Sequence, residues 1–402
     1  MTAVEGLFRD TFGFCPTLLV RAPGRVNLIG EHIDYNDLPV FPMALQREVR
    51  IALRPRSDST VAVHSSSDGF EPLEFTIGTD IEASAPGSWG NYVKAPAREL
   101  ARHSGIRLGF DAVLHSDIPV AAGLSSSSAI VNAVGLALVH VNRLSIDALR
   151  LADLMADAER FVGTRGGGMD QAISLGARDG CAARISFRPL QLEHVRVPDD
   201  WCFIVADSGE AAEKSGAMRD AYNLRRSQCD EALRIVLGHI APHDDSEAHP
   251  RGYRDLRALL ETAELLDIAE RVLHGDVLRR FRHVVTEASR VDEAVHRMRT
   301  ADLEGFGRLM DASHVSLRAD YAVSSPTLDE LVESAKAGGA AGARLTGAGF
   351  GGCIVALAHR STVSSVLRTL MSGFPADREE VHGVDERVFV AVPSHGGSTR
   401  SI

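Results

Sequence analysis

The chain has 402 residues, of which 45% are hydrophobic and 24% charged, and its formal net charge is -11. At roughly 100 to 200 residues per domain, this length predicts two domains that share a cleft. The composition excludes a disordered or fibrous chain, and the negative charge disfavours nucleic acids and membrane surfaces as partners, because like charges repel.

The first residues and the cysteines predict a cytoplasmic protein. Residues 1–20 contain Glu5 and Asp10 and no basic stretch that leads into an apolar segment, so they do not resemble a signal peptide. No run of about 18 apolar residues occurs, so we expect no membrane-spanning helix. The five cysteines are scattered and form no CxxC pair, which is typical of reduced cytosolic thiols. We therefore expect neither disulfides nor a zinc site.

Apolar runs of two kinds alternate along the chain. Short runs bounded by Gly, Pro, Asp or Ser predict strands at residues 17–20, 49–53, 60–63, 110–114, 184–186, 201–206, 353–357 and 388–392. Longer runs with a helical period predict helices at residues 92–102, 128–142, 145–161, 220–237 and 281–299. Strands and helices are therefore mixed, and we expect a boundary between the two domains near residues 190–205. We expect the polar segment 240–253 to be an exposed loop and the Ser- and Gly-rich segment 394–402 to be frayed.

A cluster of charged side chains follows the first predicted strand, in residues 21–36. Arg25, Glu31, His32 and Asp34 lie close together around a short apolar stretch. Carboxylates and an imidazole at this spacing suit hydrogen bonding to the hydroxyls of a polyol. An ordinary polar turn would have the same composition, so this segment alone leaves both interpretations open.

A glycine and four serines, Gly123 and residues 125–128, come directly before an apolar helix. Small residues allow the backbone to approach a phosphate, and the free N–H groups and the dipole of a helix N-terminus favour an anion there. A serine hydroxyl could also be a ligand of magnesium. A serine-rich helix cap is the alternative, since Ser is a preferred N-cap. No Gly-Lys-Ser/Thr sequence follows the glycine, which excludes a Walker loop here.

Two further segments are rich in glycine. Asp170 and Gln171 follow three glycines within residues 163–171, a loop that could bring its backbone close to a ligand, although Asp in such a loop is also common in turns. In residues 345–357 the glycines resemble a dinucleotide fingerprint but lead into an apolar strand rather than a helix, which disfavours a dehydrogenase. This second segment is either a turn between elements or backbone that approaches a ligand.

Taken together, the four segments resemble the galactokinase branch of the GHMP kinases. Residues 25–36 are similar to the galactokinase signature, residues 123–127 to the phosphate loop of the family, and residues 345–352 to its third motif. Further similar segments are residues 88–94, 222–229, 282–287 and 310–321, whereas residues 240–270 look unlike the family. The resemblance implies an α+β, two-domain GHMP kinase fold, with residues 1–195 and 196–402 as the domains and the active site in the cleft between them.

The same resemblance implies roles for individual residues. Asp170 would face the O1 hydroxyl of the sugar, and Arg25 would lie beside it and the transferring phosphoryl group. The sugar-binding residues would be Glu31, His32, Asp34, Gly167 and Tyr222. The ATP-binding residues would be Trp89, at the adenine, with Gly123, Leu124, Ser125, Ser126, Ser127 and Ser128. Mg²⁺ would be held by Ser127 and Glu159, with Ser126 as the neighbouring candidate.

The resemblance therefore implies a monomeric enzyme that transfers the γ-phosphate of ATP to O1 of galactose. Gly166, Gly167 and Gly168 before Met169 resemble the N-acetylgalactosamine kinases, so that sugar is the alternative substrate. Ile33, where galactokinases usually have Thr, and Leu38-Pro39, in place of a glycine-containing turn, also leave open how large the pocket is around C2 of the sugar. A non-catalytic galactose and ATP sensor is a further alternative, but such relatives have a shortened serine loop. Residues 31–35 argue against mevalonate or homoserine, which offer no polyol.

Overall fold

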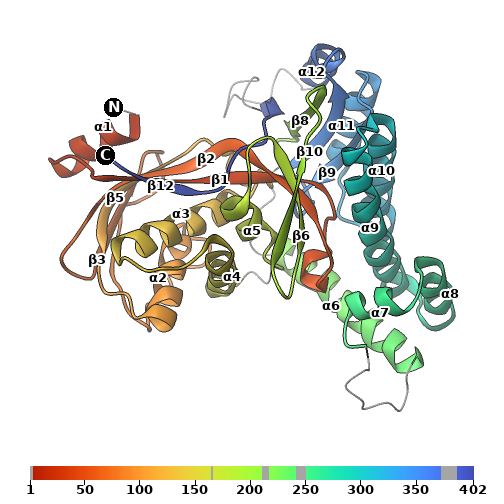
Figure 1. Cartoon of the computed structure of the whole chain (residues 1–402), viewed down its shortest axis with the longest axis horizontal. Helices are drawn as coiled ribbons and strands as arrows, with labels where there is room; N and C mark the ends of the chain where they lie inside the picture. Colours follow the sequence, from red (N-terminus) through yellow and green to blue (C-terminus); the bar gives the residue numbers. More distant parts are fainter. Residues whose placement is uncertain (1–2, 164–165, 211–216, 241–249, 373–386) are drawn as a thin grey trace.

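A computed structural model describes residues 3–163, 166–210, 217–240, 250–372 and 387–402 (Figure 1). Its N-terminal part is built on a six-stranded sheet with the order β12-β1-β2-β5-β3-β4. Neighbouring strands are antiparallel except β3 and β5, which are parallel. The strands are β1 (Leu18–Ile29), β2 (Phe41–Pro55), β3 (Thr60–Ser65), β4 (Leu73–Thr76), β5 (Phe110–Ser116) and β12 (Ser398–Ser401).

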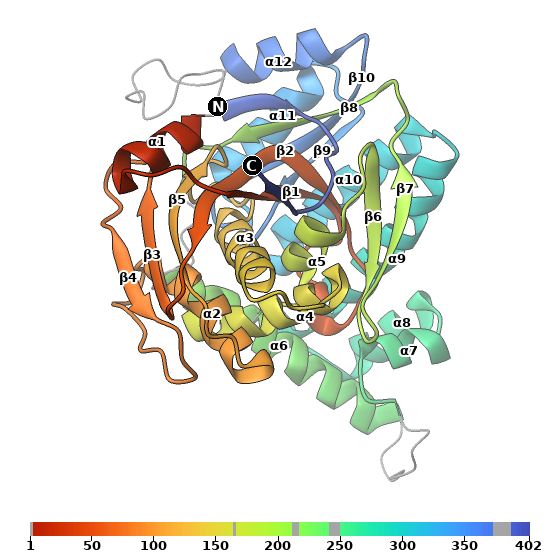
Figure 2. The ribbon, with the colours of Figure 1, turned by 60° about the vertical axis from the view of Figure 1, so that its left-hand side comes forward.

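Helices cover both faces of this sheet. One face packs against α3 (Ser126–Val141) and α5 (Met169–Gly176). These two helices are covered in turn by α2 (Gly90–Ser104) and α4 (Ala148–Ala158), which also contact the short η2 (Glu159–Val162). The other face carries α1 (Ala3–Phe12; Figure 2). Phe8 of this helix packs with Ala52 and Val113 of the sheet. Helices α3 and α4 approach closely because Gly135 has no side chain: a Cβ there would lie 2.5 Å from the sulfur of Met155.

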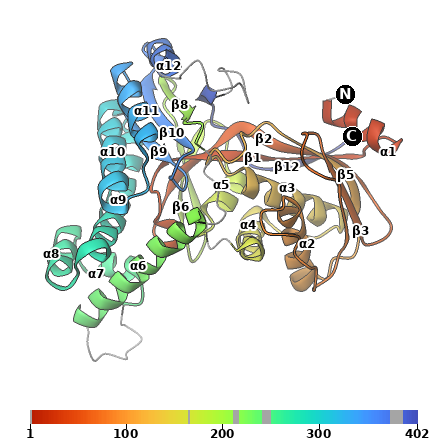
Figure 3. The same ribbon diagram turned by 180° about the vertical axis from the view of Figure 1, so that it is seen from behind.

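The C-terminal part has a four-stranded antiparallel sheet with the order β11-β8-β10-β9. Its strands are β8 (Trp201–Asp207), β9 (Gly342–Thr346), β10 (Cys353–His359) and β11 (Val388–Ala391). Its helices are α6 (Ala217–Ile240), α7 (Tyr253–Leu259), α8 (Thr262–Val272), α9 (Gly275–Arg299), α10 (Leu303–Ser316), η3 (Leu317–Tyr321), α11 (Pro326–Ala337) and α12 (Val363–Ser372). Figure 3 shows α9, α10 and α11 beside this sheet and α6, α7 and α8 projecting at one end of the molecule.

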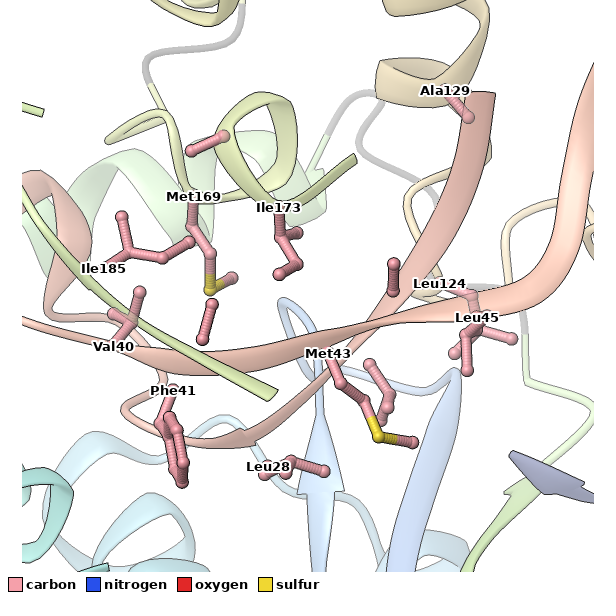
Figure 4. Close-up of a cluster of buried hydrophobic side chains, with 14 of the residues drawn as sticks. Leu28, Val40, Phe41, Met43, Leu45, Leu124, Ala129, Met169, Ile173 and Ile185 are labelled. Atoms are coloured by element: carbon pink, nitrogen blue, oxygen red, sulfur yellow. The ribbon is translucent and has the colours of Figure 1, made fainter. Parts of the chain in front are cut away.

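A hairpin of β6 (Cys181–Ser186) and β7 (Gln191–Arg196) connects the two parts. It follows α5, and Ile185 forms a bridge with Val40 just before β2. One continuous hydrophobic core joins the two sheets. Figure 4 shows a part of it, where Val40 and Ile185 lie beside Met169 of α5, and Leu28, Phe41 and Met43 lie on the other side of strands β1 and β2. Since α5 carries Asp170, this packing fixes the position of that side chain.

Most of the predicted elements are present at their predicted places. The helix predicted over residues 145–161 is α4 followed by the 3₁₀ turn η2. The strand predicted at residues 17–20 is much longer, because β1 continues through Pro23 and Gly24 by way of a bulge. Of the polar segment predicted as a loop, residues 241–249 lie outside the described residues. Within the described residues, no helix is long and apolar enough to cross a membrane.

The expectation that residues 394–402 are frayed is wrong. Residues 398–401 form β12, which pairs with residues 18–21 of β1. The two glycines before it allow a tight passage along α5: a Cβ on Gly396 would lie 2.3 Å from the carbonyl oxygen of Leu175, and Gly397 N donates to Ser174 O at 2.7 Å. Serine and glycine therefore serve here for close packing and not for disorder.

Candidate active site

A cleft of about 740 Å³ collects most of the residues that the sequence motifs indicated. The predicted residues that line it are Arg25, Glu31, His32, Asp34, Trp89, Gly123, Ser125, Ser126, Ser127, Glu159, Asp170 and Tyr222. We call residues 123–128 the serine loop; two of its members, Leu124 and Ser128, are buried. Gly167 contacts the side chain of Asp34. The volume is suitable for small-molecule ligands.

The ion pair of Arg25 and Asp170 lies in this cleft. Arg25 Nε donates to Asp170 Oδ1 at 2.8 Å and Arg25 Nη2 to Oδ2 at 3.2 Å, a bidentate pair between β1 and the first turn of α5. Burial opposes the charge of Arg25, but Asp170, Glu31 and Asp34 raise its pKa above the ordinary value. Arg25 is therefore a fixed cation inside the cleft, with only 5% of its surface exposed.

The serine loop is attached to this ion pair. Arg25 Nη1 donates to Gly123 O at 2.6 Å, and Ser125 Oγ donates to Asp170 Oδ2 at 2.5 Å. Ser125 has a left-handed backbone (φ 62°) and immediately precedes α3, so the N-terminus of α3, with Ser126 and Ser127, borders the cleft. The free N–H groups of a first helical turn and its dipole make this a suitable place for a phosphate.

Glu159 lies beneath the serine loop. Ser128 Oγ donates to Glu159 Oε1 at 2.5 Å and lies 3.5 Å from Asp170 Oδ2. The carboxylates of Glu159 and Asp170 are thus linked through one serine of α3, and Glu159 is 6% exposed. Glu159, Asp170 and Ser127 all line the cleft, and the polar atoms of their side chains are oxygens.

Asp34 also lines the cleft, from the short η1 turn (Asp34–Asn36), and it is held by the glycines that precede α5. Gly167 N donates to Asp34 Oδ2 at 3.0 Å. A Cβ on Gly167 would lie 2.3 Å from the backbone carbon of Asp34, so residue 167 must be glycine for this contact. Burial raises the pKa of Asp34 to about 6, and the nearby charge of Asp170 adds to this effect.

Glu31 and His32 form the floor of the same region. Glu31 accepts hydrogen bonds from Gly347 N at 2.6 Å and Asn27 Nδ2 at 3.0 Å, and it is 2% exposed. His32 has a left-handed backbone (φ 63°). Its Nδ1 lies 3.0 Å from the hydroxyl of Tyr35 and its Nε2 lies 3.1 Å from Ala348 O. Burial lowers the pKa of His32 to about 3, so its imidazole is neutral.

Aromatic side chains line both ends of the cleft. Tyr222 of α6 packs against His32 and Tyr35, with ring centroids 5.6 Å apart in each pair. At the far end Trp89 meets Phe70 edge to face at 6.1 Å, and Trp89 Nε1 donates to Glu71 O at 3.1 Å. The sequence motifs indicated Trp89 and Tyr222 but not Phe70, which stands alone in a polar segment without periodicity.

The glycine-rich segment between β9 and β10 is a turn between two strands, and its backbone also approaches another loop and the cleft, so both interpretations of the sequence apply. Gly347 packs on the serine loop: a Cβ there would lie 2.6 Å from Gly123 O. Gly347 also donates to Glu31, and both Gly347 and Ala348 line the cleft. This turn thus contacts the polar floor on one side and the serine loop on the other.

Three segments of the chain match known family signatures or domains. The galactokinase galactose-binding signature matches residues 6–55, the N-terminal domain of GHMP kinases residues 91–177, and their C-terminal domain residues 293–376. These segments carry the floor of the cleft, the serine loop with Asp170, and the glycine turn.

Similar proteins cover nearly the whole chain. A galactokinase from Roseiflexus sp. is 40% identical over 91% of this chain and 90% of its own length. A galactokinase from Chloroflexus aurantiacus is 38% identical over 93% of this chain and 92% of its own length. The crystal structure of Lactococcus lactis galactokinase complexed with galactose is 29% identical, covers 98% of both chains and has a TM-score of 0.83. The mevalonate kinase of Methanococcus jannaschii, with 17% identity and a TM-score of 0.61, shares the fold. The chain belongs to the galactokinase family of the GHMP kinases.

Proposed function

We propose that this protein is a galactokinase that transfers the γ-phosphoryl group of ATP to the O1 hydroxyl of galactose. The observation that carries the proposal is the bidentate pair of Arg25 and Asp170, with Asp170 also bonded to Ser125 of the serine loop. This arrangement places a carboxylate and a cation between Glu31 and His32, which we propose to bind the sugar, and the N-terminus of α3, which we propose to bind phosphate. Phosphoryl transfer requires mainly such positioning and neutralisation of charge.

Asp170 and Arg25 have separate tasks in this proposal. Asp170 orients the O1 hydroxyl and accepts its proton, either before or during transfer. Arg25 offsets the negative charge on the transferring phosphoryl group, and its existing bond to Gly123 O keeps its guanidinium in place without reorganisation. Serine-loop N–H groups and the hydroxyls of Ser126 and Ser127 hold the phosphates at the start of α3.

The floor of the cleft recognises the sugar. Glu31 and Asp34 offer carboxylate oxygens, and neutral His32 and Tyr222 line the same space. Carboxylates accept hydrogen bonds, so they pair with sugar hydroxyls that donate. A sugar with one inverted hydroxyl leaves such a buried acceptor unpaired, which costs about 1 to 3 kcal/mol. Galactose should therefore be preferred to glucose.

The oxygen donors beside the serine loop fit Mg²⁺. Glu159 is a nearly buried carboxylate, and Ser127 and Ser128 supply hydroxyls beside it. Within the described residues, no group of three or more His, Cys, Asp or Glu forms a complete metal cage. Mg²⁺ is commonly bound in this way, by one or two protein ligands together with substrate phosphates. When bound with ATP, it would neutralise phosphate charge, and Glu159 and Ser127 would hold it.

N-acetylgalactosamine is the second candidate substrate. Gly166 lines the cleft, and a Cβ built on it would meet no atom within 4 Å, so there is room at this position. The sensor alternative is weaker, because the serine loop is intact and Asp170 is paired with Arg25.

The bounds of the two lobes, the oligomeric state and the cellular location of the protein are proposals as well. We infer two lobes, residues 1–195 and 196–402, with the cleft residues drawn from both and with β12 returning to the N-terminal sheet. We also infer that the protein is a monomer in the cytoplasm and that it binds neither nucleic acids nor membranes. Its net charge of -11 supports the last point, because nucleic acids and membrane surfaces are also negatively charged. Light scattering during size-exclusion chromatography tests the monomer, and a dimer would contradict it.

An ADP-release assay over a panel of hexoses tests the function. We expect galactose to be the best substrate, N-acetylgalactosamine the second, and glucose poorer by about 10- to 100-fold in kcat/KM. Activity should disappear with EDTA and return with magnesium. Equal efficiency on glucose and galactose, or no phosphorylation of either galactose-type sugar, would contradict the proposal.

A further inference from the structure

Arg344, on β9 directly before the glycine turn, is completely buried. Its Nη2 lies 3.5 Å from Glu31 Oε1, and its Nη1 donates to Asn27 O at 3.4 Å. Its Nε and Nη2 have no hydrogen-bond partner within the described part of the chain. A buried guanidinium with so few partners costs folding free energy, so the stability of the fold does not account for it.

Glu31 is the anion that Arg344 faces, and it is the only one of the pair that reaches the cleft. Burial raises the pKa of Glu31, whereas the charges of Arg344 and then Arg25 act in the opposite direction. Gly347 and Asn27 donate hydrogen bonds to its two oxygens, which also favours the ionised form. The charge of Glu31 thus depends on a balance between burial and these neighbours.

The other groups around Glu31 cannot replace Arg344. Arg25 is paired with Asp170. On α9, Glu287 is paired with Arg290, and burial lowers the pKa of His283 to about 4, so His283 is neutral.

The remaining titratable neighbours also bring no positive charge. Asp34 of η1 adds negative charge. His32 is neutral because burial lowers its pKa to about 3, and burial raises the pKa of Tyr222 well above its ordinary value. Arg344 is therefore the cation on the closed side of Glu31, away from the cleft.

We propose that Arg344 is a positioning residue that holds Glu31 ionised and fixed, so that Glu31 accepts a hydrogen bond from a sugar hydroxyl. This inference rests on the proposed function. An ionised carboxylate only accepts hydrogen bonds, whereas a protonated one brings a proton that needs its own acceptor. Arg344 does not touch the substrate, and it acts through the state of Glu31.

The test uses the full-length protein with Arg344→Met, and it measures galactose Kd by calorimetry without ATP between pH 5.5 and 9. Without Arg344, the pKa of Glu31 rises further, so Glu31 is protonated at a pH where it is ionised in the wild type. We expect galactose affinity to fall by about 10- to 100-fold near neutral pH. The ratio of variant to wild-type Kd should decrease as pH rises through the new pKa of Glu31. In turnover, KM for galactose should rise more than kcat falls.

Two further variants separate this role from a general effect on the fold. Arg290→Met removes a cation from the same buried cluster, but one that is paired with Glu287, so galactose Kd should change less than about threefold. Arg344→Lys places another cationic group at this position and should restore part of the wild-type pH profile, because burial lowers the pKa of a lysine more readily than that of an arginine. Thermal unfolding of each variant checks that it is folded.

A double-mutant cycle with Glu31→Gln keeps the test decisive even if Arg344→Met alone does not fold. The double variant has no unpaired buried carboxylate, and its galactose Kd should equal that of Glu31→Gln within about threefold. A further loss of affinity in the double variant, or a folded Arg344→Met protein with the wild-type Kd at every pH, would overturn the inference. Wild-type protein that does not phosphorylate galactose would instead refute the proposed function.

Discussion

At one end of the cleft, Glu31 and His32 are nearly buried and are fixed by bonds to backbone atoms of distant segments. At the other end, Trp89 and Ser127 are half-buried, and Phe70 is 36% exposed. The end proposed for the sugar is thus held by contacts within the protein, whereas the end proposed for the nucleotide offers backbone N–H groups and aromatic surface. A preformed polar site discriminates between similar ligands, because any mismatch leaves a buried group unpaired.

The largest effect is expected where the two ends meet, at Asp170. Asp170→Asn keeps the size of the side chain and removes its charge and basicity. We expect kcat to fall by about 10²- to 10⁴-fold, the usual range for a general acid or base, with galactose binding largely retained. Steady-state kinetics and calorimetry check both parts. A folded variant with kcat within a few-fold of wild type would remove Asp170 from the chemistry.

At the nucleotide end, Glu159→Ala removes the buried carboxylate that we place beside the metal. We expect the magnesium concentration for half-maximal activity to rise by about 10- to 100-fold, while galactose Kd measured without ATP stays unchanged. The control is Asp153→Ala, an exposed acid on the neighbouring helix α4. A wild-type magnesium requirement in Glu159→Ala would exclude Glu159 as a metal ligand.

At the sugar end, Gly167→Ala tests how tightly the site is built. The new Cβ would lie 2.3 Å from the backbone of Asp34 and would push the Asp34 carboxylate out of place. We expect KM for galactose to rise by about tenfold or more, with a smaller change in KM for ATP. Gly166→Ala is the matched control, because open space surrounds that position. Equal effects of the two substitutions on galactose would contradict the assigned role of Gly167.

The smallest effect is the pH dependence of sugar binding. Asp34, with its pKa raised to about 6, loses its charge as pH falls through 6. The Kd for galactose should therefore be about tenfold higher at pH 5 than at a pH well above 6, and Asp34→Asn should lack this pH dependence. Folding raises the pKa of Asp34 from its ordinary value of 3.8 to about 6. Ionising Asp34 therefore destabilises the fold, and the free energy of unfolding should decrease as pH rises from the ordinary pKa to about 6. The Tm of Asp34→Asn should then exceed that of wild type above pH 6 and not below pH 4.

The sequence predicted the fold class, the helices α2, α3, α4, α6 and α9, and most of the named residues that line the cleft, because each motif combines a local structural signal with a set of chemically suitable side chains. It could not predict that β1 continues through Pro23 and Gly24, since both residues normally end a strand. The sequence also could not distinguish a frayed tail from strand β12. A segment rich in serine and glycine occurs both in frayed tails and where the backbone packs closely, as at Gly396 and Gly397.

Long-range contacts were the other part that the sequence did not reveal. Arg344 and Glu31 are more than 300 residues apart, and Arg344 lies in a buried strand without any motif of its own. Gly167 was expected to bind the sugar, and the sequence did not reveal that Gly167 donates a hydrogen bond to Asp34 and packs closely against it. Both features depend on which segments the fold brings together, and residue type alone does not determine this.

The account depends most on the claim that O1 of galactose receives the phosphoryl group. The most direct measurement uses galactose labelled with ¹³C at C1, incubated with ATP and magnesium, and follows the product by ³¹P and ¹³C NMR. We predict a phosphate ester whose phosphorus couples to C1, while 1-deoxygalactose is not phosphorylated. A product phosphorylated at another carbon, or turnover of 1-deoxygalactose, would contradict the account.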